Sequence, residues 1–329
     1  RRALALAARG QGRVEPNPMV GCVLVKHGRV IGEGYHGRYG GPHAEIDALR
    51  RCSESPRGAT AYVTLEPCCH WGQTPPCTDA LLAAGIARVV APLADPNRLV
   101  RGKGFAALRK AGIRVDVGLL AREAADLNAP FTKLMRESRP WVILKWAQSL
   151  DGKIATRTGD SKWISDEACR AHAHRIRGRA DGIIVGVGTV LCDDPLLTCR
   201  VGRPRRIATR IVLDTELRTP PRARLVRTAQ QVPTWLFCGP DAPVRRARTL
   251  EQAGCIIHRA PVTKHGVSLP AVLDVLGRVP MTNILVEGGG TLVGRFFDQQ
   301  LADEFHIYVA PLLIGGTAAP GPLHGQGVR

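Results

Sequence analysis

The sequence predicts an α/β protein built from two domains. Short runs rich in β-branched residues alternate with stretches whose apolar residues recur every three or four positions, which is typical of layered α/β folds. The chain has 329 residues, more than the roughly 100–200 of one typical domain. Between residues 127 and 140, Asn128, Pro130, Ser138 and Pro140 interrupt the apolar patterns. We therefore expect a junction near residue 139, with domains at 1–138 and 139–329.

The first domain is expected to begin with a β-hairpin. Two apolar runs flank His27-Gly28-Arg29, which is a turn signal, and a glycine-rich loop follows at 37–42. After the loop, helix-period stretches alternate with runs of strand-forming residues. The expected strands are 20–25, 30–35, 59–65, 87–92 and 113–117, and the expected helices are 43–52, 79–84 and 105–111.

The second domain is expected to start again with a strand and to keep the alternation. Ser165 or Asp166 is a suitable N-cap for its first helix, and Trp163 just before them is compatible with a core position. The expected strands are 141–146, 182–187, 210–214, 234–238, 283–286 and 304–310, and the expected helices are 166–179 and 291–297.

Composition excludes several classes of protein. Hydrophobic residues make up 44% of the chain and charged residues 22%, which argues against disorder. No uncharged apolar run approaches the roughly 18–20 residues that cross a bilayer. The formal net charge of +18 would attract nucleic acids, phosphorylated metabolites and acidic surfaces alike. Because the arginines are scattered and aromatic residues make up only 5%, we expect a generally basic surface rather than a nucleic-acid platform.

The cysteines indicate the compartment and one candidate site. Most of the ten stand alone in apolar stretches, which is typical of a reducing environment, so we expect a soluble cytoplasmic protein. The exception is the group at 68, 69 and 77, whose neighbours include histidines and a glutamate. This group indicates metal chemistry rather than disulfide chemistry.

Four residues have the composition of a catalytic zinc site. His43-Ala44-Glu45 opens an expected helix, Cys68 follows a strand, and Cys77 stands at another helix start. One imidazole and two thiolates leave the fourth tetrahedral position to water, as in catalytic zinc sites. Helix N-termini favour the thiolate form of the cysteines. Glu45 is placed to take a proton from the metal-bound water and to deliver it to a ring nitrogen and a leaving amine.

The spacing of these residues is that of the zinc-dependent nucleobase deaminases, with one difference. These enzymes combine H-x-E with P-C and usually close the site with C-x-x-C. Here eight residues separate Cys68 from Cys77, a longer loop than in the nucleic-acid-editing members. A structural Cys/His cluster or a set of buried free thiols is the alternative. A closed structural site would call for a fourth ligand and would leave Glu45 without a role.

Two glycine clusters in the second domain differ in strength as signals for a phosphate-bearing ligand. Gly288-Gly289-Gly290 follows a strand and precedes a helix, where backbone N–H groups can approach a phosphate; an ordinary tight turn is the alternative. Gly186-Val187-Gly188 lacks the third glycine of a dinucleotide fingerprint and is a weak signal.

Together these motifs resemble the bifunctional riboflavin-biosynthesis deaminase/reductase family over nearly the whole chain. The segments that carry the likeness are Asn17-Pro18-Met19-Val20-Gly21, His43-Ala44-Glu45, 64–77, Asp95-Pro96-Asn97, 145–153, 159–165 and 287–291. The resemblance implies a cytidine-deaminase-like three-layer α/β/α domain followed by a dihydrofolate-reductase-like α/β domain. It also implies a homo-oligomer, either a dimer or a tetramer.

The resemblance further implies two consecutive reactions. The first is zinc-dependent hydrolytic deamination of 2,5-diamino-6-(5-phosphoribosylamino)pyrimidin-4(3H)-one. The second is reduction of the ribosyl side chain to a ribityl chain, in which NADPH supplies a hydride to C1′. The substrate is thus a small phosphorylated pyrimidine, with neither a nucleic acid nor a membrane as partner.

The resemblance also implies roles for individual residues. In the first domain, His43, Cys68 and Cys77 hold Zn²⁺, Glu45 moves protons, and the pyrimidine pocket contains Asn17, His70, Asp95 and Asn97. In the second, the residues that hold the substrate are Lys145, Ser161, Arg177, Asp193, Leu196, Arg200 and Glu287. Of these, Arg177 and Arg200 suit the phosphate, and either Lys145 or Asp193 supplies a proton. The cofactor contacts are Trp163, Gly188, Thr189, Gly289 and Gly290. The chain departs from the family's usual residues at Cys69, in place of Ser, and Arg98, in place of Pro.

Two other functions compete with this one. The charge and the zinc motif would also suit a basic nucleic-acid deaminase with an accessory RNA-binding domain. Alternatively, the second half is a non-catalytic module that presents basic side chains to RNA. The long loop before Cys77 and the set of Ser161, Asp193 and Glu287 argue against the first of these.

Overall fold

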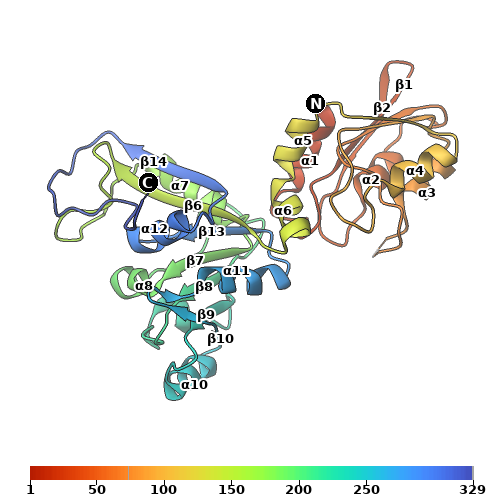
Figure 1. Cartoon of the computed structure of the whole chain (residues 1–329). Helices are drawn as coiled ribbons and strands as arrows, with labels where there is room; N and C mark the ends of the chain where they lie inside the picture. Colours follow the sequence, from red (N-terminus) through yellow and green to blue (C-terminus); the bar gives the residue numbers. More distant parts are fainter. Residues whose placement is uncertain (73, 328–329) are drawn as a thin grey trace. The chain divides into compact units, whose positions relative to one another are not determined.

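A computed structural model describes residues 1–72 and 74–327 of the chain (Figure 1). The chain divides into two compact units, Arg1–Ser138 and Arg139–Arg329, called here the first and second unit. Within the described residues, every helix is too short or too polar to cross a membrane.

The first unit is built on a five-stranded sheet with the order β2-β1-β3-β4-β5. β1 runs antiparallel to β2 and β3, whereas β3, β4 and β5 are parallel. Its strands are β1 (Gly21–Lys26), β2 (Arg29–Tyr35), β3 (Thr60–Val63), β4 (Arg88–Ala91) and β5 (Arg114–Val117). Its helices are α1 (Arg2–Ala7), η1 (Ala8–Gly10), α2 (Ala44–Arg50), α3 (Cys77–Ala83), α4 (Lys103–Lys110), α5 (Ala121–Leu127) and α6 (Ala129–Glu137).

Helices cover both faces of this sheet and make three layers. Leu24 of β1 belongs to a core shared with α2, α3 and α4, whereas its neighbour Val23 packs with α1 on the other face. Two glycines permit close packing of the helices: a Cβ at Gly21 would clash with the backbone of α1, and a Cβ at Gly34 with that of α2. The expected cytidine-deaminase-like layering is therefore confirmed.

The second unit contains a seven-stranded parallel sheet with the order β10-β9-β8-β7-β13-β6-β14. Its strands are β6 (Trp141–Ser149), β7 (Gly182–Gly186), β8 (Thr209–Leu213), β9 (Thr234–Cys238), β10 (Ile256–Arg259), β13 (Asn283–Glu287) and β14 (Glu304–Ala310), and a separate ribbon joins β11 (Val262–Thr263) to β12 (Gly266–Val267). Its helices are α7 (Glu167–Arg177), α8 (Val187–Asp193), α9 (Arg224–Arg227), α10 (Val244–Gln252), α11 (Leu269–Arg278) and α12 (Gly290–Asp298).

The order of these strands brings distant parts of the sequence together. In Figure 1 the yellow-green strand β6 lies between the blue strands β13 and β14. In the sequence, more than half of the residues of the second unit separate β6 from these two strands. One core cluster packs α7 to α10 against one face of the sheet, and a second packs α11 and α12 against the other. From β7 to β10 successive strands are added toward one edge of the sheet. The chain then returns to the middle, where β13 lies between β7 and β6, and β14 lies at the other edge. Open α/β sheets generally bind ligands at the carboxyl ends of the strands beside the point where the strand order reverses, so a ligand site is expected at the carboxyl ends of β7, β13 and β6.

The segment 311–327, called here the C-terminal segment, lies across the second unit. Asp151, in the turn after β6, accepts hydrogen bonds from the backbone N–H groups of Ile314 (3.1 Å) and Gly315 (2.8 Å). Asp298, at the end of α12, accepts one from Gln326 N (2.8 Å). Two exposed carboxylates, those of Asp151 and Asp298, thus hold this segment to the rest of the unit.

Most expected elements are present, and some expectations were wrong. Each expected strand and helix has a counterpart shifted by a few residues, but α1, η1, α5, α6, α8, α9, α10, α11, β10, β11 and β12 were not expected. Asp166 is the N-cap of α7, since its carboxylate accepts a hydrogen bond from Cys169 N at 2.8 Å. Trp163 is not a core residue: it is 71% exposed, and the Arg170 guanidinium lies 4.6 Å from its ring centre.

Candidate functional site

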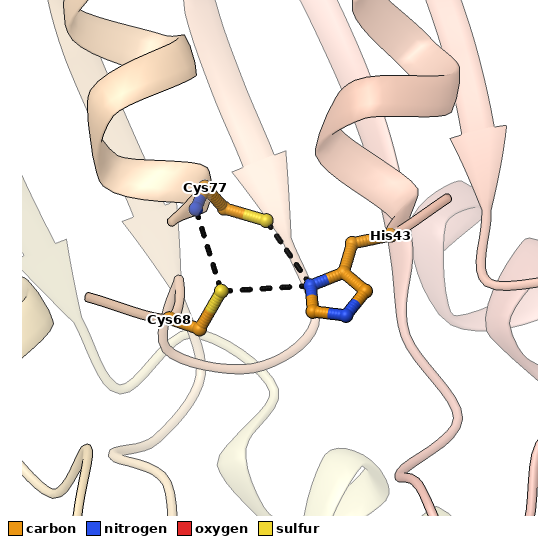
Figure 2. Close-up of side chains that lie close together, drawn as sticks. All are labelled: His43, Cys68 and Cys77. Carbon is orange, nitrogen blue, oxygen red and sulfur yellow. Dashed lines mark hydrogen bonds between the residues drawn. The ribbon is translucent and has the colours of Figure 1, made fainter. Parts of the chain in front are cut away.

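Three side chains that could hold a metal ion converge in the first unit (Figure 2). His43 is the N-cap of α2, Cys68 lies in the loop after β3, and Cys77 is the first residue of α3. The Nδ1 atom of His43 lies 3.3 Å from Cys77 Sγ and 3.5 Å from Cys68 Sγ. Their ligand atoms all lie within 4.8 Å of one another. Figure 2 shows both sulfur atoms on the Nδ1 side of the imidazole ring.

The donor set fits a zinc ion. With Zn–N of about 2.0 Å and Zn–S of about 2.3 Å, tetrahedral coordination places the nitrogen and each sulfur about 3.5 Å apart. The two N–S distances of 3.3 and 3.5 Å are close to this value. Three ligands from a histidine and two cysteines, with the fourth position left to solvent, are typical of a catalytic zinc site.

The two thiols have unequal acidity in the metal-free protein. The hydrogen bond from the Cys77 thiol, with smaller contributions from His43, lowers the pKa of Cys68 to about 4. The same hydrogen bond and burial raise the pKa of the Cys77 thiol. A dication supplies the charge that a second thiolate needs, so zinc binding would release a proton from Cys77.

Glu45 lies beside this cluster on the first turn of α2. Its side chain is buried, with 3% of the residue exposed. Burial, together with the negative charge of Cys68, raises the pKa of its carboxyl to about 7. A carboxyl with a pKa near neutrality can both accept and return a proton during one reaction.

A cavity of about 260 Å³ opens onto the cluster. His43, Glu45 and Cys68 line it, and so do all four residues expected in a pyrimidine pocket, Asn17, His70, Asp95 and Asn97. The Nδ1 atom of His70 is buried and has no hydrogen-bond partner among the described residues. Burial, assisted by the nearby negative charges of Glu66 and Cys68, raises the pKa of Asp95 to about 6. The structure therefore joins residues from four distant segments in one cavity.

His36 lines the same cavity and was not expected from the sequence. Its Nδ1 lies 2.9 Å from Pro42 O, and its Nε2 lies 3.1 Å from Asn17 Nδ2. A carbonyl oxygen can only accept, so the proton is on Nδ1 and Nε2 accepts from the Asn17 amide. The amide oxygen of Asn17 is then left for a ligand. The glycine-rich loop that follows His36 was the available signal.

In the second unit a cavity of about 270 Å³ gathers five of the expected residues. These residues are Lys145, Ser161, Trp163, Arg177 and Arg200. Burial and the guanidinium groups of Arg177 and Arg224 lower the pKa of Arg200, which marks a concentration of positive charge. Such a concentration suits a phosphate group.

Arg177 and Glu287 form a buried ion pair beside this cavity. Arg177 Nε lies 3.0 and 3.1 Å from the two carboxylate oxygens of Glu287, and its Nη2 donates to the same carboxylate. Burial works to raise the pKa of Glu287, but the charges of Arg177 and Lys145 outweigh it and lower that pKa. The guanidinium of Arg177 is thus directed at Glu287.

Other expected residues lie outside the lining of this cavity. Asp193 is the exposed last residue of α8, and Leu196 follows in the next loop, where its carbonyl oxygen accepts from Arg210 Nη1 at 3.4 Å. His174, which the sequence did not single out, lines the cavity and accepts a hydrogen bond from Arg200 N at 3.2 Å. The sequence could have indicated His174 because it stands in the last turn of α7, among basic residues and one helical turn before Gly178.

The two glycine clusters meet at the carboxyl ends of neighbouring strands. A Cβ added to Gly288, after β13, would lie 3.5 Å from Thr189 Oγ1, in the helix after β7. Cβ atoms at Gly188 and Gly289 would meet no atom within 4 Å, so their backbone is open to a ligand. At Gly290, by contrast, a Cβ would lie 2.6 Å from Gly321 O. The missing side chain of Gly290 makes room for the C-terminal segment.

Comparisons with known proteins match both units. A family model for the cytidine and deoxycytidylate deaminase zinc-binding region matches residues 1–93, and one for the RibD C-terminal domain matches 140–329. A curated relative from Bacillus amyloliquefaciens, named riboflavin biosynthesis protein RibD, is 43% identical over 327 residues, covering 99% of this chain and 87% of its own. The protein of that name from Escherichia coli K12 is 43% identical over 329 residues, with coverage of 96% and 88%.

Two solved structures are similar over almost the whole chain. RibD of Acinetobacter baumannii has a TM-score of 0.88 at 38% identity, covering 100% of this chain and 90% of its own. A protein of Thermotoga maritima, titled a diaminohydroxyphosphoribosylaminopyrimidine deaminase/5-amino-6-(5-phosphoribosylamino)uracil reductase, has a TM-score of 0.83 at 38% identity, with coverage of 96% and 86%.

Proposed function

Since the chain belongs to the bifunctional riboflavin-biosynthesis deaminase/reductase family, and is thus both a zinc-dependent deaminase and a reductase, we propose a role for each of its two sites. Residues 1–138 would carry out the deamination and residues 139–329 the reduction. The comparisons support this function and not that of a nucleic-acid deaminase with an RNA-binding domain. The observation that carries the proposal is the cavity lined by Glu45, by His43 and Cys68 of the metal cluster, and by the four pocket residues.

In the deaminase site, His43, Cys68 and Cys77 would hold Zn²⁺, which supplies activation of a water molecule when bound. Glu45 would accept the two protons of that water in turn and pass one to the pyrimidine ring nitrogen and the other to the leaving amino group. The pKa of about 7 at this buried carboxyl supports both transfers near neutral pH. The water oxygen would form a bond to C2 of the substrate, the C2–N bond to the exocyclic amino group would break, and ammonia would leave.

Asn17, His70, Asp95 and Asn97 would orient the pyrimidine. His36 fixes the amide of Asn17 so that its oxygen can accept from an amino group of the substrate. The amide oxygen of Asn97 accepts from Leu99 N at 3.0 Å, which directs its NH₂ group to donate to a ring oxygen or nitrogen. The pocket thus offers both an acceptor and a donor, as a diaminopyrimidinone requires.

In the reductase site, Lys145, Ser161 and Arg200 would hold the ribose phosphate, with Arg200 as the main phosphate partner. The proposed cofactor is NADPH, which supplies the hydride for C1′ of the ring-opened sugar; a proton goes to the attached nitrogen. Of the two expected donors, Lys145 lines the cavity and Asp193 does not, which favours Lys145. Arg177 and Glu287 would stabilise one side of the cavity through their ion pair. Leu196 would stabilise the loop after α8 through its hydrogen bond with Arg210.

Trp163, Gly188, Thr189 and Gly289 would contact the cofactor. The open backbone at Gly188 and Gly289 supports this proposal, because a pyrophosphate can approach it closely. Gly290 would act through the neighbouring C-terminal segment. Titration with NADPH and NADH, followed by the change in reduced-nicotinamide fluorescence, tests both the site and the preference for the 2′-phosphate.

We further propose that the enzyme is a cytoplasmic homo-oligomer, with the phosphorylated pyrimidine rather than a nucleic acid as its partner. Reducing conditions would keep Cys68 and Cys77 available for zinc. The edge strand β14 exposes Phe305, Ile307 and Val309 by 44, 47 and 54%, which suits an apolar contact with a second copy. Light scattering on the wild type and on Ile307→Lys tests this surface, since a dimer held there should dissociate.

Mass spectrometry of the products tests the two reactions together. Zinc-loaded protein is given the diaminopyrimidinone ribosylamino phosphate with and without NADPH. Deamination should occur without NADPH, and a gain of two hydrogens should follow only when NADPH is present. Deamination with no cofactor-dependent gain would contradict the reductase proposal and leave the deaminase site standing.

A further inference from the structure

Glu66 is a buried carboxylate that the proposed mechanism does not use. It lies between β3 and the zinc ligand Cys68, and 3% of its surface is exposed. Three backbone N–H groups donate to it. Its Oε2 accepts from Asp95 N (3.0 Å) and Gly102 N (2.8 Å), and its Oε1 accepts from Phe105 N (3.1 Å).

The three donors span the segment 95–105, called here the pocket loop, which consists of the loop before α4 and the first turn of that helix. Asp95 is its first residue, and Asp95, Asn97 and Val100 line the deaminase cavity. Within the loop, Asp95 Oδ1 accepts from Asn97 N at 2.8 Å. The position of Asn97 therefore depends on Asp95, and that of Asp95 on Glu66.

Glu66 also supplies the missing cap of α4. That helix has Gly102 at its N-cap position and no side-chain cap of its own. Gly102 N and Phe105 N, the N-cap and N3 donors, both point at the Glu66 carboxylate. A negative charge at a helix N-terminus is favourable, and charge-assisted hydrogen bonds are stronger than neutral ones. The carboxylate thus anchors the end of the pocket loop as well as its start.

Gly104 shows how closely α4 approaches this anchor. A Cβ at Gly104 would clash with Pro67 O and would lie 3.1 Å from Glu66 Oε1. The segment that carries the zinc ligand and the first turn of α4 are therefore in direct contact, with no room for a side chain between them.

We infer that Glu66 is a positioning residue of the deaminase, which fixes the pocket loop, and with it Asp95 and Asn97, relative to the zinc ligands. The inference rests on the proposed role of Asp95 and Asn97 in the pyrimidine pocket. Pocket groups of this kind bind the substrate in its ground state and its transition state alike, so their displacement should raise KM more than it lowers kcat.

Glu66→Gln tests the inference with little change in shape. The amide has one acceptor oxygen, so its NH₂ group must face at least one of the three N–H donors. We expect faster hydrogen exchange in peptides covering 95–105 and a KM for deamination raised roughly tenfold or more, the effect of one lost charge-assisted hydrogen bond. Zinc content and the reductase rate should stay at wild-type values. Glu54→Gln, at an exposed position of the same unit, is the matched control.

Gly104→Ala is a second, independent variant. Alanine favours an isolated helix over glycine, but here its Cβ must push α4 away from Pro67. It should raise KM as Glu66→Gln does, and the two changes together should raise it by less than the product of their separate effects. Separate effects that multiply in full would argue against a shared contact.

Asn97→Ala separates failure of this inference from failure of the proposed pocket. If Asn97→Ala raises KM but Glu66→Gln leaves both KM and hydrogen exchange unchanged, the inference is overturned and the pocket stands. If hydrogen exchange increases in Glu66→Gln while KM stays normal in both Glu66→Gln and Asn97→Ala, the pocket assignment is wrong. The inference, which rests on that assignment, is then wrong as well. Loss of zinc from Glu66→Gln would show that Glu66 supports the metal loop, which also overturns the inference.

Discussion

Glu45 combines deep burial with a carboxyl pKa of about 7, and its role depends on that proton. Glu45→Gln keeps the shape of the side chain but can neither accept nor return a proton. We expect full zinc content and a deamination rate at least ~100-fold lower, the lower range for loss of a general acid–base. Metal analysis and steady-state kinetics measure both. A near-normal rate would remove Glu45 from the mechanism, and loss of zinc would make it a ligand.

The Arg177–Glu287 pair predicts an asymmetric effect on stability. Arg177→Ala leaves the Glu287 carboxylate buried without its partner, which typically destabilises a protein by about 3–5 kcal/mol. We expect a loss of this size in the free energy of unfolding of the second unit, measured by urea denaturation, and a lower reductase rate. Arg175→Ala, exposed on the same helix, is the control and should change stability little. Equal losses in the two variants would contradict the pairing.

Among single residues, the sequence could predict those whose side chains form a short motif. His43, Cys68, Cys77 and Glu45 have spacings that zinc chemistry constrains. Glu66 acts instead on backbone N–H groups some 29 to 39 positions away in the chain. Such contacts leave no pattern in the sequence, because any residue can present a backbone N–H.

At the scale of elements, the turn after β6 predicts a pH dependence. Hydrogen bonds from Ser149 Oγ and from the N–H groups of Ile314 and Gly315 lower the pKa of Asp151 to about 2. In the unfolded chain an aspartate titrates near about 3.9. A carboxyl whose pKa is lowered by folding stabilises the fold above its unfolded pKa, and this contribution disappears as the pH falls from about 4 to about 2.

Asp151→Asn removes that contribution. At pH 6 the variant should be less stable to urea than the wild type, and the C-terminal segment should exchange its amide protons faster. The difference in the free energy of unfolding should shrink as the pH is lowered through the window given above. A difference that stays constant with pH would show that the charge of Asp151 is not what holds the segment.

Prolines explain why two of the helices, α6 and α11, were not expected. Pro130 in α6 and Pro270 in α11 stand in the first turns of their helices, where a proline has no N–H to lose and its fixed φ suits the helix. In a sequence, a proline also indicates a loop, so neither segment was predicted to be a helix. Strands such as β8 and β9 were expected correctly because they are short runs of mostly β-branched and apolar residues that are buried in the sheet.

At the scale of the whole molecule, the two sites should respond separately to loss of metal. Cys68→Ala removes one of the three proposed zinc ligands, so zinc and deamination should be lost while reductase turnover with NADPH is kept. Each unit has its own core clusters, which is the physical reason for this independence. Metal analysis and separate assays of the two reactions measure the outcome. Retained zinc at full occupancy would overturn the ligand assignment.

Chelation of zinc from the wild type should reproduce that result without a substitution. A ligand that binds only the folded state stabilises it, so metal removal should lower the unfolding temperature of the first unit and leave that of the second unchanged. Differential scanning calorimetry with and without a chelator compares the two. A shift of both transitions would argue that the units do not unfold independently.

The strand order of the second unit has a consequence for protein synthesis. β6 is the first strand of its sheet to leave the ribosome, but its neighbours β13 and β14 begin only at residues 283 and 304. At roughly 5–20 residues per second, the apolar strand waits on the order of ten seconds with both edges unpaired. The sheet of the first unit, by contrast, is complete within residues 21–117. Slower growth or a nascent-chain chaperone should therefore raise the yield of active reductase more than that of active deaminase.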